Sequence, residues 1–228
     1  MKSNTILGVL FFKTAICEGI SKTFKLLLNM LDVKCLIVVG DTNENVDKNV
    51  KHAWNIVKIE GESYHIDLTW DVNRSFSNAI SHAYFCLSDK NAIKTHSWRF
   101  GEIPVCVCEK NYYKENGLVA NNEYDICCII DNACTQGKLS VEIQTNVSKS
   151  INDYAELCMR IIKHHPHTKA AVEVGMDASS MVILFRWTLH GEDFSKKVEG
   201  KNAVLAQNKN AGFGLFESIK NFFEKLRK

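Results

Sequence analysis

Three residues of this chain have the types and the order needed for nucleophilic catalysis: Cys17, His52 and Asp67. A cysteine is a good nucleophile as a thiolate, and a helix N-terminus stabilises a thiolate through its unpaired N–H groups and its dipole. Apolar residues recur at helical spacing over residues 17–31, so Cys17 is expected at the start of a helix. Because most cysteines are small core residues, the catalytic interpretation of Cys17 depends on its partners.

A predicted β-hairpin supplies those partners. Residues 52–59 and 62–70 alternate in polarity on either side of two residues with the composition of a tight turn. With a two-residue turn, His52 and Asp67 point to the same side of the sheet as diagonal neighbours, about 7–8 Å apart at the backbone. The aspartate can then hold the imidazole in one tautomer, while Cys17 lies alongside the imidazole. An ordinary surface pair is the alternative, and a three-residue loop would separate the two side chains.

Three further residues are candidates for substrate binding or for the rim of the site. Trp54 is expected beside His52, where it either shields the site from water or packs in the core. Gly19 leaves room near the nucleophile for the close approach of another chain. His65, on the same face as Asp67, either reaches the rim or is a half-buried structural histidine.

The three chemical residues lie within longer motifs. These are Thr14-Ala15-Ile16-Cys17-Glu18-Gly19-Ile20-Ser21, His52-Ala53-Trp54-Asn55-Ile56-Val57 and Tyr64-His65-Ile66-Asp67-Leu68-Thr69-Trp70-Asp71. In sequence, order and spacing they resemble the nucleophile, histidine and aspartate motifs of bacterial transglutaminase-like proteins. Four later segments are also similar to that family: Tyr84-Phe85, Ser88-Asp89, His96-x-Trp98 and Asn111-Tyr112-Tyr113. The resemblance covers about residues 12–120.

The resemblance implies a role for each residue. Cys17 would be the nucleophile, His52 the general acid/base and Asp67 the orienting group, with the backbone N–H of Cys17 as one donor to the oxyanion. It also implies a papain-like α+β transglutaminase core, in which a helix carrying the cysteine packs on a small antiparallel sheet. Family members act on amide bonds of peptides or proteins through an acyl-enzyme.

Two questions about activity stay open in the sequence. Hydrolysis is favoured over acyl transfer to amines, because nothing in the chain resembles the calcium sites and extra β-domains of the large animal transglutaminases. Only sixteen residues precede Cys17, whereas family members usually carry several helical segments there. The alternative is therefore a catalytically weak transglutaminase-like module that binds peptides or proteins.

The whole chain is predicted to be α+β, in four parts. These are a catalytic domain at 1–122, a small α+β unit at 123–190, a polar linker at 191–212 and an amphipathic helix at 213–228. Within the small unit we expect a helix at 151–164 and strands at 126–130, 139–143, 169–175 and 181–188. Residues 41–51 are polar and are expected to form a surface loop. The helix at 213–228 either docks on its own domain, oligomerises, or contacts a membrane surface or a partner.

Composition narrows the choice of partners and compartment. The net charge is only +2, so we expect no nucleic-acid partner. Nine cysteines without a Cys-x-x-Cys pair predict reduced thiols in a cytoplasmic protein rather than a disulfide framework. The apolar run at 6–12 is too short to span a membrane, and as a signal peptide it would place cleavage almost at Cys17.

One histidine cluster has residues that could bind a metal. His164, His165 and His167 follow a predicted helix around Pro166, and we expect exposed side chains there rather than ligands. We therefore expect no metal and no cofactor. The sequence leaves the oligomeric state open.

Overall fold

The protein has a mixed α+β fold, as expected. The computed structural model describes residues 3–12, 15–45, 48–74, 81–165 and 168–189, so the predicted linker and the helix at 213–228 lie outside the described residues. The described chain forms two compact units: one contains the chain up to Arg74 and Tyr84–Asn111, and the other begins at Tyr112 and includes residues 81–83. The boundary thus lies earlier than the expected one at 122/123. Within the described ranges, no helix has both the length and the apolar character needed to cross a membrane.

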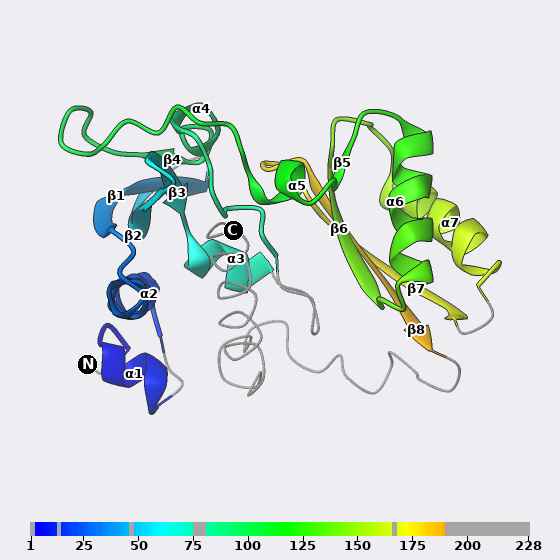
Figure 1. The fold of residues 1–228 in the computed structure, drawn as a ribbon, viewed down its shortest axis with the longest axis horizontal. Helices are drawn as coiled ribbons and strands as arrows, with labels where there is room; N and C mark the ends of the chain where they lie inside the picture. The colour runs from blue at the N-terminus through cyan, green and yellow to red at the C-terminus, as the bar shows by residue number, and fades with distance from the viewer. Residues whose placement is uncertain (1–2, 13–14, 46–47, 75–80, 166–167, 190–228) are drawn as a thin grey trace. The chain divides into compact units, whose positions relative to one another are not determined.

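The first unit is built on a four-stranded antiparallel sheet with the order β3-β2-β1-β4 (Figure 1). Its strands are β1 (Cys35–Asn45), β2 (Lys48–Ile59), β3 (Glu62–Ile66) and β4 (His96–Ser97). Its helices are α1 (Ile6–Leu10), α2 (Cys17–Met30), α3 (Leu68–Arg74) and α4 (Asp89–Ala92). Cys17 is therefore the first residue of α2, as the apolar spacing predicted.

The turn between β2 and β3 has two residues, as predicted. Ile59 pairs with Glu62 across the turn. Glu60 and Gly61 both have positive φ, at 51° and 90°, which is typical of a type I′ hairpin turn. The strand does not continue to residue 70, however, because β3 ends at Ile66 and a helix follows.

The polar segment expected as a loop at 41–51 is mostly strand. β1 continues to Asn45, and β2 begins at Lys48. Asp41 pairs with Lys51 in the ladder, and the two side chains form an ion pair of 2.9 Å. The sequence of this hairpin is polar and lacks the apolar alternation that predicts a strand.

Helix α2 packs against β2 through buried polar contacts. The Ser21 hydroxyl donates to the Ala53 carbonyl at 3.0 Å, and the Asn55 amide donates to the Ser21 carbonyl at 3.1 Å. Phe24 and Leu28 are buried on the same helix. Because buried polar groups must be paired, these hydrogen bonds fix where α2 lies on the strand.

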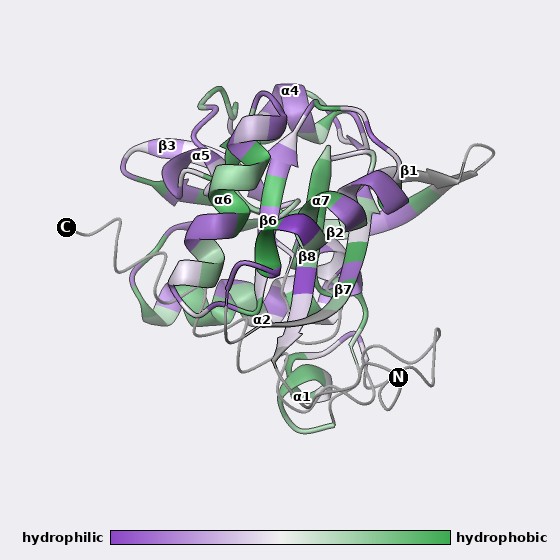
Figure 2. Cartoon of the chain, turned by 90° about the vertical axis from the view of Figure 1, so that its right-hand side faces the viewer, coloured by the Kyte–Doolittle hydropathy of each residue, from purple (hydrophilic) through white to green (hydrophobic). Residues whose placement is uncertain are grey.

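The second unit combines a four-stranded sheet with two helices. Its elements are α5 (Tyr112–Glu115), β5 (Val119–Ala120), α6 (Glu123–Thr135), β6 (Ser140–Thr145), α7 (Ile151–Ile162), β7 (Thr168–Asp177) and β8 (Val182–Leu189). The strand order is β5-β6-β8-β7, with β5 parallel to β6 and the remaining pairs antiparallel. Figure 2 shows that α6 and β6 each carry green, hydrophobic stretches alongside purple, hydrophilic ones.

The strand predicted at 126–130 is wrong, because these residues belong to α6. Asn122 caps the helix by accepting a hydrogen bond from the Asp125 amide. The buried residues of α6 recur at helical spacing: Ile126, Ile130, Ala133 and Cys134. A short apolar run fits a strand or a buried helix equally well, and only its longer periodicity separates them.

Candidate active site

Asp67 lies at the point where β3 ends and α3 begins, and it makes this transition possible. Its Oδ1 atom accepts hydrogen bonds from the amides of Thr69 at 2.9 Å and Trp70 at 3.1 Å. An aspartate before the first turn of a helix satisfies N–H groups that have no partner within the helix. The capping contact therefore fixes the carboxylate and leaves Oδ2 for other donors.

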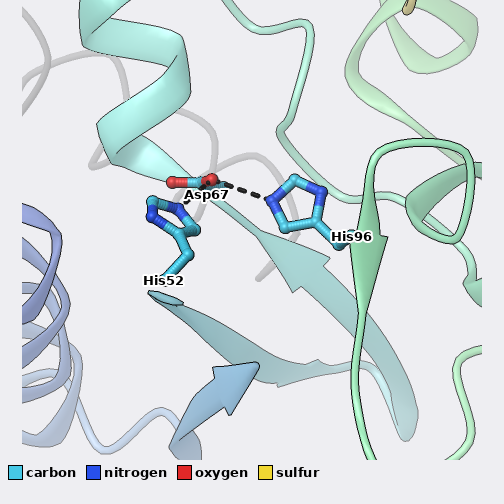
Figure 3. A group of neighbouring side chains, drawn as sticks. All are labelled: His52, Asp67 and His96. Atoms are coloured by element: carbon cyan, nitrogen blue, oxygen red, sulfur yellow. Dashed lines mark hydrogen bonds and ion pairs between the residues drawn. The ribbon is translucent and has the colours of Figure 1, made fainter. Parts of the chain in front are cut away.

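Two imidazoles share that second oxygen (Figure 3). His52 Nε2 lies 2.7 Å from Asp67 Oδ2, and His96 Nε2 lies 3.0 Å from the same atom. All three side chains are buried. The predicted pairing of His52 with Asp67 is thus present in the structure, and His96 joins it from β4.

The end of β3 explains how Cys17 reaches His52. β3 pairs with β2 only from Asn55 to Ile59, so the backbone of Ala53 lies beyond the last paired position. The N-terminal part of α2 occupies this stretch of β2: Ala53 accepts the Ser21 hydroxyl through its carbonyl and hydrogen-bonds the Cys17 thiol through its backbone. The same thiol hydrogen-bonds the His52 side chain. Since His52 Nε2 is bound to Asp67, Nδ1 is the nitrogen left for sulfur.

These contacts shift the pKa values in the directions that an ion pair requires. The hydrogen bond with His52 lowers the pKa of Cys17 below its ordinary 9.0, against the opposing effect of burial. Burial disfavours the charged form of His52, but hydrogen bonds with Asp67 and Cys17 outweigh it and raise the pKa to about 9. Burial likewise opposes ionisation of Asp67, yet the hydrogen bonds from His52 and His96 lower its pKa to about 2. The site therefore favours a thiolate, an imidazolium and a carboxylate.

Four buried thiols have pKa shifts opposite in direction to that of Cys17. Burial raises the pKa of Cys35 and Cys134 to about 11, and that of Cys106 and Cys158 to about 12. Cys17 is half-buried, so its sulfur is not sealed in the core. A depressed pKa together with partial exposure is the combination found at reactive cysteines.

Trp54 and His65 lie in the core beneath the site. The Trp54 indole donates from Nε1 to His65 Nδ1 at 2.9 Å, and His65 Nε2 lies 2.8 Å from Asp89 Oδ1. Trp54 also stacks on His52, with ring centroids 6.1 Å apart. For both residues the structure favours the core interpretation, in which they support His52 from behind.

Two glycines allow close packing around the site. A Cβ at Gly19 would lie 2.5 Å from the carbonyl oxygen of Ser3, so the segment that approaches α2 here is the protein's own N-terminal part. Gly40 pairs with His52, and a Cβ there would lie 2.7 Å from the Trp54 ring and would also overlap the Ser97 carbonyl oxygen. Gly40 was not singled out in the sequence, although its place opposite His52 follows from the strand register.

His96 is the site residue that sequence reasoning missed as a participant. The His96-x-Trp98 motif is part of the family resemblance, but that resemblance implies no role for His96. Two-residue β4 carries His96, which pairs with Thr42 of β1. So short a strand has no periodic signal, and the His-x-Trp motif was the only available indication.

Two clusters of the described residues bring together groups of metal-ligating type: His52 with Asp67 and His96, and His65 with Asp89 and Cys106. In a tetrahedral site with metal–ligand distances of about 2.1 Å, ligand atoms lie about 3.4 Å apart. The first cluster has hydrogen-bond distances of 2.7 and 3.0 Å instead. In the second, His65 accepts the Trp54 N–H at Nδ1, so a neutral ring carries its proton on Nε2 and has no lone pair there for a metal. Both arrangements are hydrogen-bond networks.

The histidines at the end of α7 fall outside these clusters. His165 Nε2 lies 2.8 Å from Asp131 Oδ1. Residues 166 and 167 lie outside the described residues.

No protein-family model and no curated protein matches this chain. The transglutaminase-like interpretation therefore depends on the sequence motifs and on the geometry around Cys17.

Proposed function

We propose that this protein is a cysteine-dependent enzyme that acts on amide bonds of peptides or proteins through an acyl-enzyme, on a papain-like transglutaminase core. The observation that carries the proposal is the hydrogen-bonded series from the Cys17 thiol through the His52 imidazole to the Asp67 carboxylate. Each group has the protonation state that the chemistry needs, and the carboxylate is held by the helix that it caps.

The tautomer of His52 follows from the ionised carboxylate. Asp67 Oδ2 accepts a hydrogen bond from the Nε2–H of His52, so Nδ1 of the neutral ring presents a lone pair to the thiol. Transfer of the thiol proton to Nδ1 gives a thiolate and an imidazolium, which Asp67 stabilises. This is the ion pair that the pKa shifts favour.

The reaction then needs no group beyond this series and water. The thiolate attacks the amide carbonyl, and a C–S bond forms as the carbonyl oxygen becomes an oxyanion. The imidazolium gives its proton to the amide nitrogen, the C–N bond breaks, and an amine leaves. Water attacks the thioester while His52 takes its proton, and collapse of the second tetrahedral intermediate releases the acid and the thiol. With an amine in place of water, the same steps transfer the acyl group.

The start of α2 suits the developing oxyanion. Cys17 is the first helical residue, and the preceding Ile16 makes no side-chain cap. N–H groups in a first helical turn lack carbonyl partners within the helix, and the helix dipole favours negative charge there. The amide of Cys17 is our candidate for one oxyanion donor.

The cysteine content supports a cytoplasmic setting. All nine cysteines are free in the structure, including pairs of neighbours in sequence such as Cys127 and Cys128. A thiolate nucleophile is also susceptible to oxidation, from which a reducing compartment would protect it.

The acyl-enzyme can be tested directly with p-nitrophenyl acetate, an activated ester that acylates nucleophilic thiols. We expect a burst of a single equivalent of nitrophenolate, and mass spectrometry should place the acetyl group on the peptide containing Cys17. Cys17→Ser and His52→Ala should lose the burst, whereas Cys128→Ser, which alters an exposed thiol, should keep it. A full-length protein that carries no acetyl group on Cys17 would contradict the proposal and favour the binding module.

Added glycinamide then separates the two outcomes of deacylation. If hydrolysis dominates, as we propose, the yield of acetyl-glycinamide stays low while acetate accumulates. Acetyl-glycinamide as the main product would identify an acyltransferase instead.

A further inference from the structure

His96 has no part in the three-residue series, yet it is hydrogen-bonded to Asp67, the last residue of that series. Its Nε2 atom lies 3.0 Å from Asp67 Oδ2, the same oxygen that His52 contacts (Figure 3). Its Nδ1 atom lies 2.8 Å from the Thr95 hydroxyl, and its side chain is only 2% exposed. Both nitrogens of this buried imidazole are therefore hydrogen-bonded, which fixes the orientation of the ring.

We propose that His96 is a positioning residue, which acts through Asp67 to keep the carboxylate ionised and correctly turned while His52 gains and loses its proton. The proposal rests on the proposed function, because it gives His96 a task within that site. It adds a fourth side chain to the site and states that this side chain acts through Asp67, neither of which the motif resemblance supplies.

The hydrogen bonds around Asp67 account for all of its acceptor capacity. An ionised carboxylate has about four lone-pair sites. Two amides of α3 fill those of Oδ1, and His52 and His96 fill those of Oδ2. With four donors in place the carboxylate cannot rotate without losing a hydrogen bond, and protonation of Asp67 would displace one of them.

The proton of His96 must lie on Nε2 for this arrangement. Asp67 Oδ2 can only accept, so each imidazole donates its Nε2–H to it. The Thr95 hydroxyl lies 2.8 Å from His96 Nδ1 and also donates to the Ala92 carbonyl at 3.4 Å, so it holds the other side of the ring in place.

The surroundings hold the His96 ring in place. The rings of Trp54, Trp70 and Tyr84 lie 4.9, 4.7 and 5.9 Å from it, measured between centroids. The backbone of His96 is fixed by the pairing of β4 with β1. A flat aromatic replacement therefore has room to pack, which makes the hydrogen bond separable from the fold.

Two substitutions isolate the Nε2–H donor. His96→Phe keeps an aromatic ring but cannot donate, whereas His96→Gln places an amide N–H near the position of Nε2. The other titratable side chains near Asp67 and His96 are His52, Cys17 beyond it, Asp71, whose amide donates to the Asp67 carbonyl, and His65, which interacts electrostatically with His96. These groups are the same in the wild type and in both variants, so differences report on His96.

The measurement is the rate of Cys17 alkylation by iodoacetamide as a function of pH, followed by peptide mapping on the full chain. Without the His96 donor, Asp67 keeps three hydrogen bonds instead of four and orients His52 less firmly. The imidazolium and the thiolate are then less stabilised, so the acid limb of the profile should move up by about one pH unit in His96→Phe. His96→Gln should keep the limb close to that of the wild type. Nitrogen NMR of the wild type should show a proton on His96 Nε2.

The outcomes separate this inference from the proposed function. If wild-type Cys17 is selectively alkylated but the limb of His96→Phe coincides with it, His96 is structural only and the inference fails. The inference also fails if both variants shift alike, since the donor then makes no difference. If wild-type Cys17 shows no selective reactivity, the proposed function itself fails, whatever the variants do.

Discussion

Replacing Asp67 with asparagine removes one negative charge and leaves most of the local structure in place. Asparagine is as good a helix cap as aspartate, so its amide oxygen can still accept from the Thr69 and Trp70 amides. The amide nitrogen then faces His52, and its N–H groups oppose the Nε2–H of the imidazole. His52 is driven to the other tautomer, which points a hydrogen rather than a lone pair at Cys17.

The magnitude follows from the pKa values. In the folded protein the pKa of His52 is raised from 6.5 to about 9, a difference that corresponds to at most about 3 kcal/mol in favour of the imidazolium. Without that charge, the pKa of Cys17 should return towards its ordinary 9.0, where only about 1% of the thiol is ionised at neutral pH. We therefore expect alkylation of Cys17 near pH 7 to slow by about 10- to 100-fold in Asp67→Asn.

The assay is timed alkylation with iodoacetamide, with peptide mapping to follow each cysteine. Asp89→Asn is the matched control, because Asp89 is also paired with a histidine in the same unit, 2.8 Å from His65. It should leave the rate at Cys17 within about twofold of the wild type. If Asp67→Asn folds and its Cys17 reacts as fast as in the wild type, the carboxylate does not support the ion pair and the assigned role of Asp67 is wrong.

Three further predictions concern the scaffold. Gly40→Ala should destabilise the protein by about 1–3 kcal/mol in urea unfolding, because the new methyl group would overlap the Trp54 ring and the Ser97 carbonyl; an unchanged unfolding midpoint would contradict the packing described here. Glu60→Asn should stabilise it by up to about 1 kcal/mol, because asparagine tolerates the φ of 51° better than glutamate, and a loss of stability would refute the turn type. The pKa of Asp67 is lowered from 3.8 to about 2, so its contribution to the free energy of unfolding is nearly complete at pH 4 and is lost as the pH falls to about 2. Over that range the free energy of unfolding should fall by about 2 kcal/mol more in the wild type than in Asp67→Asn. Parallel plots of unfolding free energy against pH would show that Asp67 is not paired.

The pairing of His52 with Asp67 could be predicted from the sequence because it depends on local rules. A two-residue turn fixes the register, and the register fixes which side chains share a face. The prediction that the strand runs to residue 70 was wrong for a reason that is also local. Asp67 both contacts His52 and caps the N-terminus of α3. A capping residue directly after a strand continues the strand's alternation of polar and apolar residues, so the sequence pattern does not show where the strand ends.

The remaining differences come from contacts between distant parts of the chain. His96 reaches Asp67 from a two-residue strand whose position depends on its pairing with β1. No periodicity marks such a strand, and no spacing rule connects it to the hairpin. The helix α6 was mistaken for a strand because its apolar run is short, and only the burial of residues further along the helix shows the helical period.

The most direct test of the account compares Cys17 with the other eight cysteines in one sample. Brief treatment of the full chain with a small amount of iodoacetamide at about pH 6 alkylates thiolates and spares neutral thiols. We predict that Cys17 is labelled at least about tenfold faster than any other cysteine, and that His52→Ala abolishes the difference. Equal labelling of Cys17 and an exposed cysteine such as Cys128 would contradict the central claim that Cys17 and His52 form an ion pair.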